Sequence, residues 1–335
     1  MNTRKQMIFR LAVIIINYRT PNFIRNCLES LNSQLDPQRD IVVIVDNASN
    51  DGSDFIIEQF IKERSWTQWV RLLRSPKNGG FSAGNNYGIR RTNSKFYLLL
   101  NSDTLVRPDA IKQLLYASER YKEIFLFSPR LEWPDRKPQK SCFRFWRPSH
   151  EFFAAARTGM VEKLFAYQGI TYSDPHQPMT PDWISFACVL IRKEALDRIG
   201  LLDEGYFMYF DDMDFCRRAR EEGLDILHWP AARVVHLRGG SGPVKQLAAA
   251  RKRPPKYWYS SRNRYYAKFY GRLGLWQANL FWYAGRILSL AREMTRLKQP
   301  HTCERQWLDI WTNALKPLEK QSIFFTSEKC NEKDV

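Results

Sequence analysis

The 335-residue sequence has only six cysteines, and no two of them form a C-x-x-C pair. This scattered pattern argues against a zinc ribbon or a disulfide scaffold and fits the reducing cytoplasm. Long hydrophobic runs are also missing, since no stretch approaches the roughly 20 apolar residues that cross a bilayer as a helix. The apolar run at 11–16 is too short for the core of a secretory signal. We therefore expect a cytoplasmic protein without a membrane span.

Two common phosphate-binding motifs are absent as well. The sequence contains no G-x-x-x-x-G-K-[ST], which argues against a P-loop NTPase. No G-x-G-x-x-G follows the first predicted strand, which argues against a dinucleotide-dependent oxidoreductase.

Acidic residues are scarce in one segment near the C-terminus. The whole chain has 52 Lys and Arg against 35 Asp and Glu, a net charge of +17. Residues 243–300 contain 13 basic residues and one acid, so this segment alone carries a net charge of +12. A basic segment of this kind suits phosphate-bearing partners, namely nucleic acid, anionic lipid headgroups or a phosphorylated substrate.

The first hundred residues alternate between strand and helix patterns. Apolar, β-branched runs predict buried strands at 11–16, 41–45, 70–73 and 96–100. The segments between them predict helices at 21–34, 54–63 and 80–90. Strands separated by helices indicate βαβ units, and hence an α/β fold with a mostly parallel sheet flanked by helices.

The pattern is less regular beyond this point. Residues 131–180 are rich in proline and are interpreted as an insertion or variable loop region. Regular structure returns with a predicted strand at 183–191 and a predicted helix at 211–222, closed by Gly223. Two short strands are predicted at 226–228 and 233–236.

Polar residues follow each of the early predicted strands. They are Asn17-Tyr18-Arg19, Asp46-Asn47, Asn78-Gly79-Gly80 and Asn101-Ser102-Asp103. Any strand must end in a polar turn, but four such ends in series indicate a ligand site, because ligands of open parallel sheets bind beyond the carboxyl ends of the strands. Asp103, with an amide two residues earlier, is a candidate ligand for Mg²⁺ or Mn²⁺, which prefer oxygen ligands.

Two further candidates lie in the second half of the chain. Asp211, Asp212 and Asp214 follow an aromatic run at 206–210. They are open to two interpretations, N-terminal capping of a helix or a general base whose pKa is raised by an apolar wall and by like charges. His236 is either a structural histidine or a metal or phosphate ligand at a strand end.

The combined pattern resembles the family 2 glycosyltransferases of the GT-A fold, in their rhamnosyltransferase-like branch. The matching stretches are VIIINYR (13–19), VDNASNDGS (45–53), NGGFSAGNNYG (78–88), LLNSD (99–103), GYFMYFDDMD (205–214) and HLRGGS (236–241). The resemblance covers about 10–240. It implies a GT-A (Rossmann-like) catalytic domain at 1–242, with a nucleotide-sugar half at about 1–105 and an acceptor half at about 106–242. Residues 243–335 would form a basic, aromatic, helical C-terminal extension.

The resemblance also implies roles for individual residues. Those that would bind the nucleotide sugar are Asn17, Tyr18 and Arg19, Asp46 (at the base) and Asn47, Asn78, Gly79, Gly80, Phe81 and Asn85. Asn101, Ser102 and Asp103 occupy the place of the family's D-x-D motif, where Asp103 would bind the divalent metal, with His236 as a further ligand. Asp212, or Asp211 beside it, matches the catalytic base. Asn101 replaces the first acid of D-x-D and so removes one negative charge from the metal site.

The implied function is an inverting glycosyltransferase. It would move a sugar such as rhamnose from a dTDP- or UDP-sugar to a lipid-linked or polysaccharide acceptor in cell-surface glycan synthesis.

Two alternatives are less well supported. A sugar-nucleotide nucleotidyltransferase would need a Gly-rich, basic loop directly after the first strand, where 17–19 supplies none. A nucleic-acid-binding protein would not place acids at successive strand ends, so no nucleic-acid partner is expected.

The basic segment contains a run of apolar residues at three- and four-residue spacing, which we call the apolar stripe. Its members are Leu273, Trp276, Leu280, Tyr283, Ile287, Leu290, Met294 and Leu297. One interpretation is a helix whose stripe packs on the catalytic domain with arginines toward solvent. The other is an interfacial helix on an anionic membrane, which would make this a peripheral protein at the inner face of the cell membrane.

Overall fold

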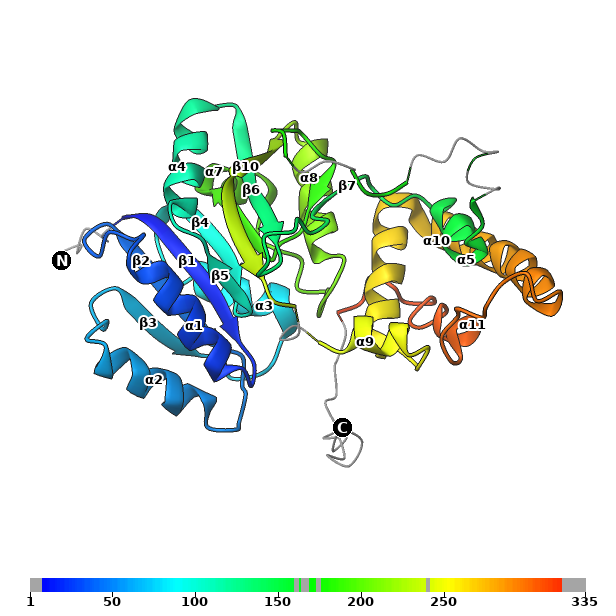
Figure 1. Cartoon of the computed structure of the whole chain (residues 1–335), viewed down its shortest axis with the longest axis horizontal. Coiled ribbons are helices and arrows are strands. Elements are labelled where there is room, and N and C mark those ends of the chain that lie inside the picture. Colours follow the sequence, from blue (N-terminus) through cyan, green and yellow to red (C-terminus); the bar gives the residue numbers. More distant parts are fainter. Residues whose placement is uncertain (1–7, 160–162, 164–168, 173–175, 239–241, 321–335) are drawn as a thin grey trace.

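The computed structural model describes residues 8–159, 163, 169–172, 176–238 and 242–320. Figure 1 shows a central twisted sheet with helices on both sides, and a second group of helices that extends from one end of this body. The sheet and its helices hold the candidate site. The second group is formed mainly by the C-terminal extension.

The sheet has eight strands in the order β3-β2-β1-β4-β9-β6-β10-β5. Their bounds are β1 Phe9–Asn17, β2 Asp40–Asp46, β3 Val70–Arg74, β4 Ser94–Asn101, β5 Thr104–Val106, β6 Ile124–Glu132, β9 Cys188–Arg192 and β10 Asp225–His236. Six strands share one direction, and β9 and β5 run against it. The predicted mostly parallel sheet is therefore confirmed.

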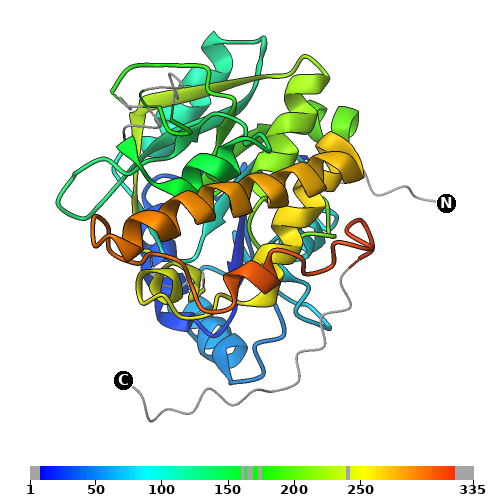
Figure 2. The same ribbon diagram turned by 90° about the vertical axis from the view of Figure 1, so that its right-hand side faces the viewer.

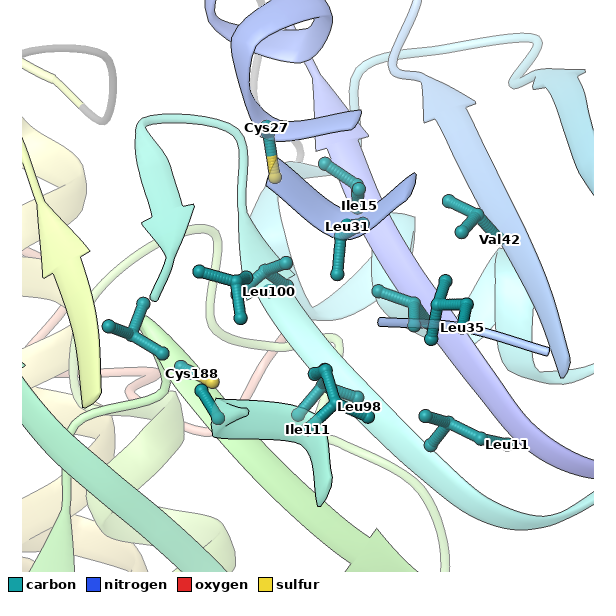
Figure 3. Close-up of a cluster of buried hydrophobic side chains, with 14 of the residues drawn as sticks. Leu11, Ile15, Cys27, Leu31, Leu35, Val42, Leu98, Leu100, Ile111 and Cys188 are labelled. Atoms are coloured by element: carbon teal, nitrogen blue, oxygen red, sulfur yellow. The ribbon is translucent and has the colours of Figure 1, made fainter. Parts of the chain in front are cut away.

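Two apolar layers hold helices against the sheet. Helices α1 (Pro21–Asn32), α2 (Ser53–Glu63) and α4 (Ala110–Arg120) cover one face. Helices α3 (Gly80–Ile89), α7 (Lys193–Ile199) and α8 (Asp211–Glu221) cover the other. Figure 3 shows part of the first layer, with Cys27 and Leu31 of α1 lying over Ile15 and Leu100 of the strands. Burial on both faces explains why the first strands are continuous apolar runs rather than alternating ones.

Several elements differ from the sequence prediction. Predicted strand 183–191 is two strands, because β8 (Trp183–Ile184) pairs with β7 (Cys142–Phe143) while β9 joins the main sheet. The strands predicted at 226–228 and 233–236 are one strand, β10, whose register shifts between Trp229 and Arg233. Pro230 lies in this interval and offers no N–H to the ladder, which explains the interruption. Elements β5, α4, β6 and α7 were not anticipated.

The C-terminal extension is helical, as predicted. It contains α9 (Val244–Ala249), α10 (Lys256–Met294) and α11 (Gln306–Asp309). Helix α10 is kinked at Gly271, whose φ is 70°. Its second half packs on α5 (His150–Ala156), which comes from the irregular middle region. Gly285 permits this contact, since a Cβ there would lie 2.3 Å from the Phe152 carbonyl oxygen.

The first half of α10 packs on the segment that leads into α8. Arg264 and Lys268 form ion pairs with Asp203 at 2.9 Å, and the Ser261 hydroxyl donates to the Met208 carbonyl at 3.0 Å. Tyr265 and Tyr266 lie in one buried cluster with aromatic residues of this segment. The extension is thus attached directly behind the start of α8. No helix that the structure describes combines the length and the apolar character needed to cross a membrane.

Candidate active site

The predicted polar strand ends meet at one edge of the sheet. Asn17 is paired in register with Asp46, and Ile16 with Asn101, so β1, β2 and β4 end side by side. The Asn17 side-chain amide donates to Asp46 Oδ1 at 2.7 Å, and the Ser49 hydroxyl and backbone N–H donate to the same carboxylate. Asp46 is 5% exposed. Its carboxylate therefore fixes the loop after β2.

Tyr18 and Arg19 form the rim above this pair. Arg19 donates from its backbone N–H to the Ser49 hydroxyl at 3.1 Å and from Nε to the Ser49 carbonyl at 3.1 Å. Its guanidinium lies over the Tyr18 ring, 5.2 Å from the centroid. These contacts tie the loop after β1 to the loop after β2, and they leave an aromatic face and a cation at the mouth of the site.

A second set of residues joins the two halves of the catalytic body. The Asn47 side-chain amide donates to Asn78 Oδ1 at 2.9 Å and to the Gly80 carbonyl at 3.0 Å. The Phe81 backbone N–H donates to the Phe207 carbonyl at 2.8 Å. Gly80 has a φ of +82°, and a Cβ there would lie 1.9 Å from that carbonyl oxygen. Only glycine permits this approach of the 205–210 segment.

The remaining members of the glycine-rich stretch have local roles. Gly79 precedes α3, where a Cβ would lie 2.6 Å from the Ala83 Cβ. The Asn85 side-chain amide donates to the Phe81 carbonyl one turn earlier and is buried. Both contacts lie within the first turns of α3 and shape the start of this helix. The predicted donor contacts of Gly79 and Asn85 stay predictions.

Asp103 and His236 come together from strands that are distant in sequence. Strand β10 pairs antiparallel with β5, which places His236 opposite Thr104. His236 Nε2 lies 3.4 Å from Asp103 Oδ1, and both side chains are almost completely buried. Neither ring nitrogen of His236 forms a hydrogen bond with the part of the chain that the structure describes. A buried imidazole nitrogen beside a carboxylate oxygen fits a divalent cation.

The same site offers few other protein ligands. Among the described residues, no group of three His, Cys, Asp or Glu is arranged to hold a metal. Asn101 is partly exposed at the end of β4, and the Ser102 hydroxyl lies 3.3 Å from that of Thr20. The residues therefore fit a metal that takes most of its remaining ligands from water and from a substrate's phosphates, as Mg²⁺ and Mn²⁺ do.

The two candidate bases begin α8. Tyr209 and Phe210, just before it, both have positive φ angles, a conformation that costs about 1–2 kcal/mol for each residue. The Ser82 hydroxyl donates to Asp211 Oδ2 at 3.2 Å, and the Met213 N–H donates to Asp212 Oδ1 at 2.9 Å. Asp211 is buried, whereas Asp212 is partly exposed.

Asp211 and Asp212 both have raised pKa values, so the charged form of each carboxyl is disfavoured. Burial raises the pKa of Asp211, and burial together with the adjacent Asp211 charge raises the pKa of Asp212. Asp214, one turn further on, differs because it pairs with Arg218 at 2.8 Å and with Lys268 at 2.6 Å. The general-base interpretation thus suits Asp212, while Asp214 anchors the helix.

Two basic residues that the sequence reasoning did not assign lie at this site. Burial lowers the pKa of Arg238, against an opposing effect of Asp103. Loss of hydration lowers the pKa of Lys245, an exposed residue of α9, with repulsion from Arg238 in the same sense and the charges of Asp103 and Asp212 opposing it. Arg238 is held by Gln139, to which its Nε donates at 2.6 Å. The HLRGGS motif contained the signal for Arg238; its residues 239–241 lie outside the described residues.

The sheet and its helices, with these residues gathered at the strand ends, form the GT-A fold of glycosyltransferases. Residues 12–173, just under half of the chain, match the family described as Glycosyl transferase family 2, and the chain is a glycosyltransferase similar to this family. The matched range contains the predicted nucleotide-binding residues and ends before Asp212 and His236.

Individual proteins show the same relationship. The chain is 25% identical over 239 residues to the low-salt glycan biosynthesis hexosyltransferase Agl10 of Haloferax volcanii, which covers 70% of this chain and 69% of the relative. It is 25% identical to the N-acetylglucosaminyl-diphospho-decaprenol L-rhamnosyltransferase of Mycobacterium tuberculosis, over 72% of this chain and 81% of the relative. The structure of GalNAc-T7 with UDP, GalNAc and Mn²⁺ matches 92% of this chain with a TM-score of 0.57 and 15% identity. The match covers 55% of that protein, and the likeness shows the fold.

Proposed function

We propose that this glycosyltransferase transfers a sugar from a dTDP- or UDP-sugar to a lipid-linked glycan acceptor, with inversion at the anomeric carbon. The observation that carries the proposal is the electrostatic position of Lys245. Its ammonium group interacts with the charges of Asp103, Asp212 and Arg238. The candidate metal ligand, the candidate base and two cations therefore lie near enough to one another for their charges to interact.

The donor's charge would be neutralised by residues on one side of this space. Asp103 and His236 are the residues that would hold Mg²⁺ or Mn²⁺, which would stabilise the negative charge that develops on the leaving diphosphate. Arg238 and Lys245 would share this role as fixed positive charges. The base and ribose would lie over Asn17, Asp46 and the rim formed by Tyr18 and Arg19.

Asp212 would act on the acceptor from the opposite side. Its carboxylate takes the proton of the attacking hydroxyl, whose oxygen forms a bond to the anomeric carbon. The bond from that carbon to the diphosphate oxygen breaks, and the electron pair leaves with the nucleoside diphosphate. A carboxylate with a raised pKa is a stronger base than an ordinary aspartate, which suits this role. Attack opposite the leaving group inverts the configuration.

The nature of the acceptor is supported by a relative. The mycobacterial protein is named for a diphospho-decaprenol acceptor, a lipid-linked sugar. The aromatic residues of the 205–210 segment and of the first half of α10 lie behind the start of α8, so the extension borders the acceptor side. We place the reaction in cell-surface glycan synthesis at the inner face of the membrane.

A donor panel with two variants tests the proposal. Wild-type protein, Asp212→Asn and Asp211→Asn are incubated with dTDP-, UDP- and GDP-sugars, and donor binding and hydrolysis or transfer are measured separately. We expect Asp212→Asn to bind the donor normally and to be inactive. Turnover of Asp212→Asn close to wild type would refute the base assignment, and loss of turnover only in Asp211→Asn would transfer it to Asp211.

A further inference from the structure

The apolar stripe of α10 faces outward. The exposed fractions of its aliphatic members and of Trp276 range from 43% for Leu290 to 84% for Met294. Only Tyr283 is half-buried, because its hydroxyl donates to the Trp307 carbonyl at 2.5 Å. The interpretation of the stripe as a face packed on the catalytic domain is therefore wrong. Figure 2 shows the second half of α10 crossing the surface nearest the viewer, outside the rest of the extension.

A different face of the same helix makes the protein contacts. Its buried members include Leu275, Ala278, Trp282, Gly285 and Ser289. Trp282 and Gly285 contact α5, and Trp282 also packs with Ile310. Leu275 and Ala278 belong to the buried aromatic cluster behind α8. The second half of α10 is consequently apolar on two sides, one covered by protein and one exposed. A helix of this composition is normally buried all round.

The exposed surface continues beyond α10. Trp276 contacts Trp311, with ring centroids 5.0 Å apart, and Tyr283 is tied to Trp307. Trp307 is 60% exposed and Leu308 is half exposed beside it. The apolar stripe and these two residues form one continuous surface, larger than the isolated exposed apolar side chains of an ordinary monomer.

The charge around this surface identifies its partner. Arg272 and Arg296 are exposed at the two ends of the stripe. The single acid of 243–300, Glu293, is already bonded to Arg286 within the helix, so this segment contributes no unpaired negative charge beside the stripe. Aromatic and aliphatic residues flanked by arginines are the composition of helices that lie in the interface of an anionic bilayer.

The spacing of the stripe also matches a coiled-coil seam, which makes a second copy of the chain the competing partner. Two copies joined at this seam would bring Arg272, Arg292 and Arg296 together with those of the other chain. Coiled coils place opposite charges beside the seam, and the stripe offers none. The anionic surface is the partner whose charge fits.

We propose that the second half of α10, with Trp307 and Leu308, is a docking surface for a lipid bilayer that contains anionic lipids. The helix would lie in the plane of the interface with the stripe among the acyl chains. The first half of α10, on the other side of the kink at Gly271, is bonded to the segment that carries Asp211 and Asp212. Docking would therefore set the distance between the active site and the membrane surface. The docking itself does not depend on the proposed reaction.

Vesicle binding of the full chain tests this proposal. Flotation is measured with phosphatidylcholine vesicles with and without phosphatidylglycerol, for wild type and for the triple variant Leu280→Gln, Ile287→Gln, Met294→Gln. All three side chains are more than 60% exposed, so the fold should be unaffected. The matched control replaces three exposed apolar residues of the catalytic body, Phe55, Ile56 and Tyr116, with glutamine.

We expect wild type and the control to bind the anionic vesicles and the stripe variant to bind at least about tenfold more weakly. A second variant, Arg272→Gln, Arg292→Gln, Arg296→Gln, should lose about a hundredfold in partitioning, roughly fivefold for each arginine. Wild-type failure to bind anionic vesicles, or equal binding by the stripe variant, would overturn the proposal. A wild-type dimer that the stripe substitutions dissociate, with no vesicle binding, would assign the seam to a second copy instead. Donor hydrolysis in solution should be the same in wild type and the stripe variant, which separates this result from the fate of the proposed reaction.

Discussion

Replacing the proposed base should make the protein more stable while it abolishes transfer. Asp212 lies at the start of α8 with its pKa raised by burial and by Asp211. A carboxyl whose pKa is raised by folding does not lower the free energy of unfolding at a pH below its unfolded-state pKa. It lowers this free energy increasingly as the pH rises toward the pKa in the folded protein. The change Asp212→Asn removes this cost and keeps an oxygen that accepts from the Met213 N–H.

The size of the gain follows from the shift. One unit of pKa corresponds to about 1.4 kcal/mol, whereas a helix N-terminus stabilises a carboxylate by only about 0.3–1 kcal/mol. A rise of a single unit therefore leaves a net gain for Asp212→Asn at neutral pH. Each kcal/mol raises Tm by roughly 2–4 °C in a domain of a few hundred residues. The trade of stability for activity is common at catalytic sites.

The assay is thermal unfolding of wild type, Asp212→Asn and Asp214→Asn at several pH values between 5 and 9. The difference between Asp212→Asn and wild type should be small at the acidic end and grow with pH. Asp214→Asn is the matched control on the same turn, and it should lose stability, because it breaks a buried pair with Arg218 and Lys268, a loss of about 3–5 kcal/mol. An Asp212→Asn variant that is less stable than wild type, or a pH-independent difference, would refute the reasoning.

Further predictions concern the donor side, the contact between the two halves at Gly80, and the pH profile. Asp103→Ala should weaken donor binding and also abolish the effect of added Mn²⁺ on donor binding. If calorimetric titration of this variant with donor and Mn²⁺ matches that of wild type, Asp103 is not a metal ligand. Lys245→Met should lower kcat by about 10²–10³-fold if Lys245 stabilises the leaving diphosphate. Lys252 is an exposed lysine of the same segment, and Lys252→Met should leave the steady-state rates unchanged. Gly80→Ala should lower the free energy of unfolding by at least about 1–2 kcal/mol because of the positive φ alone, and the contact with the Phe207 carbonyl should lower it further. Urea unfolding measures this change. The control is Gly52→Ala, because Gly52 also has a positive φ but lies in open space. The rate should rise with pH above the range of an ordinary aspartate, since the pKa of Asp212 is raised; a flat profile between pH 5 and 8 would contradict this.

The first half of the sheet could be predicted because its signals are local. Strands buried on both faces are unbroken apolar runs, and Pro21 marks the first turn of α1. The second half could not be predicted as well. The residues of β8 and β9 form one continuous strand-like stretch in the sequence, and the two strands are separate only because they pair with different partners. The three-residue β5 exists because β10 passes beside it, and no short-range pattern indicates that.

The site shows the same division. Asn17, Asp46 and Asn101 could be placed together from strand order, since they end neighbouring parallel strands. The meeting of Asp103 with His236 needs the pairing of β5 with β10, and only the family resemblance indicated it. Arg238 and Lys245 could not be assigned because basic residues are common in this chain, and charge by itself does not say which cation lies near a carboxylate.

The two unassigned cations bear on the replacement of an acid by Asn101. A metal site with two carboxylates would hold the cation more strongly than one with the single carboxylate of Asp103 and the imidazole of His236. Arg238 and Lys245 both interact electrostatically with Asp103, so in the proposed site their positive charge would repel a divalent ion until a diphosphate is present. The diphosphate would bring enough negative charge to bind the metal and to satisfy both side chains. Metal affinity without donor should therefore be weak, with donor and metal binding together. If both proposals hold, the net charge of +17 would serve two separate purposes: these cations would act on the diphosphate, and the arginines of α10 would act on the membrane surface.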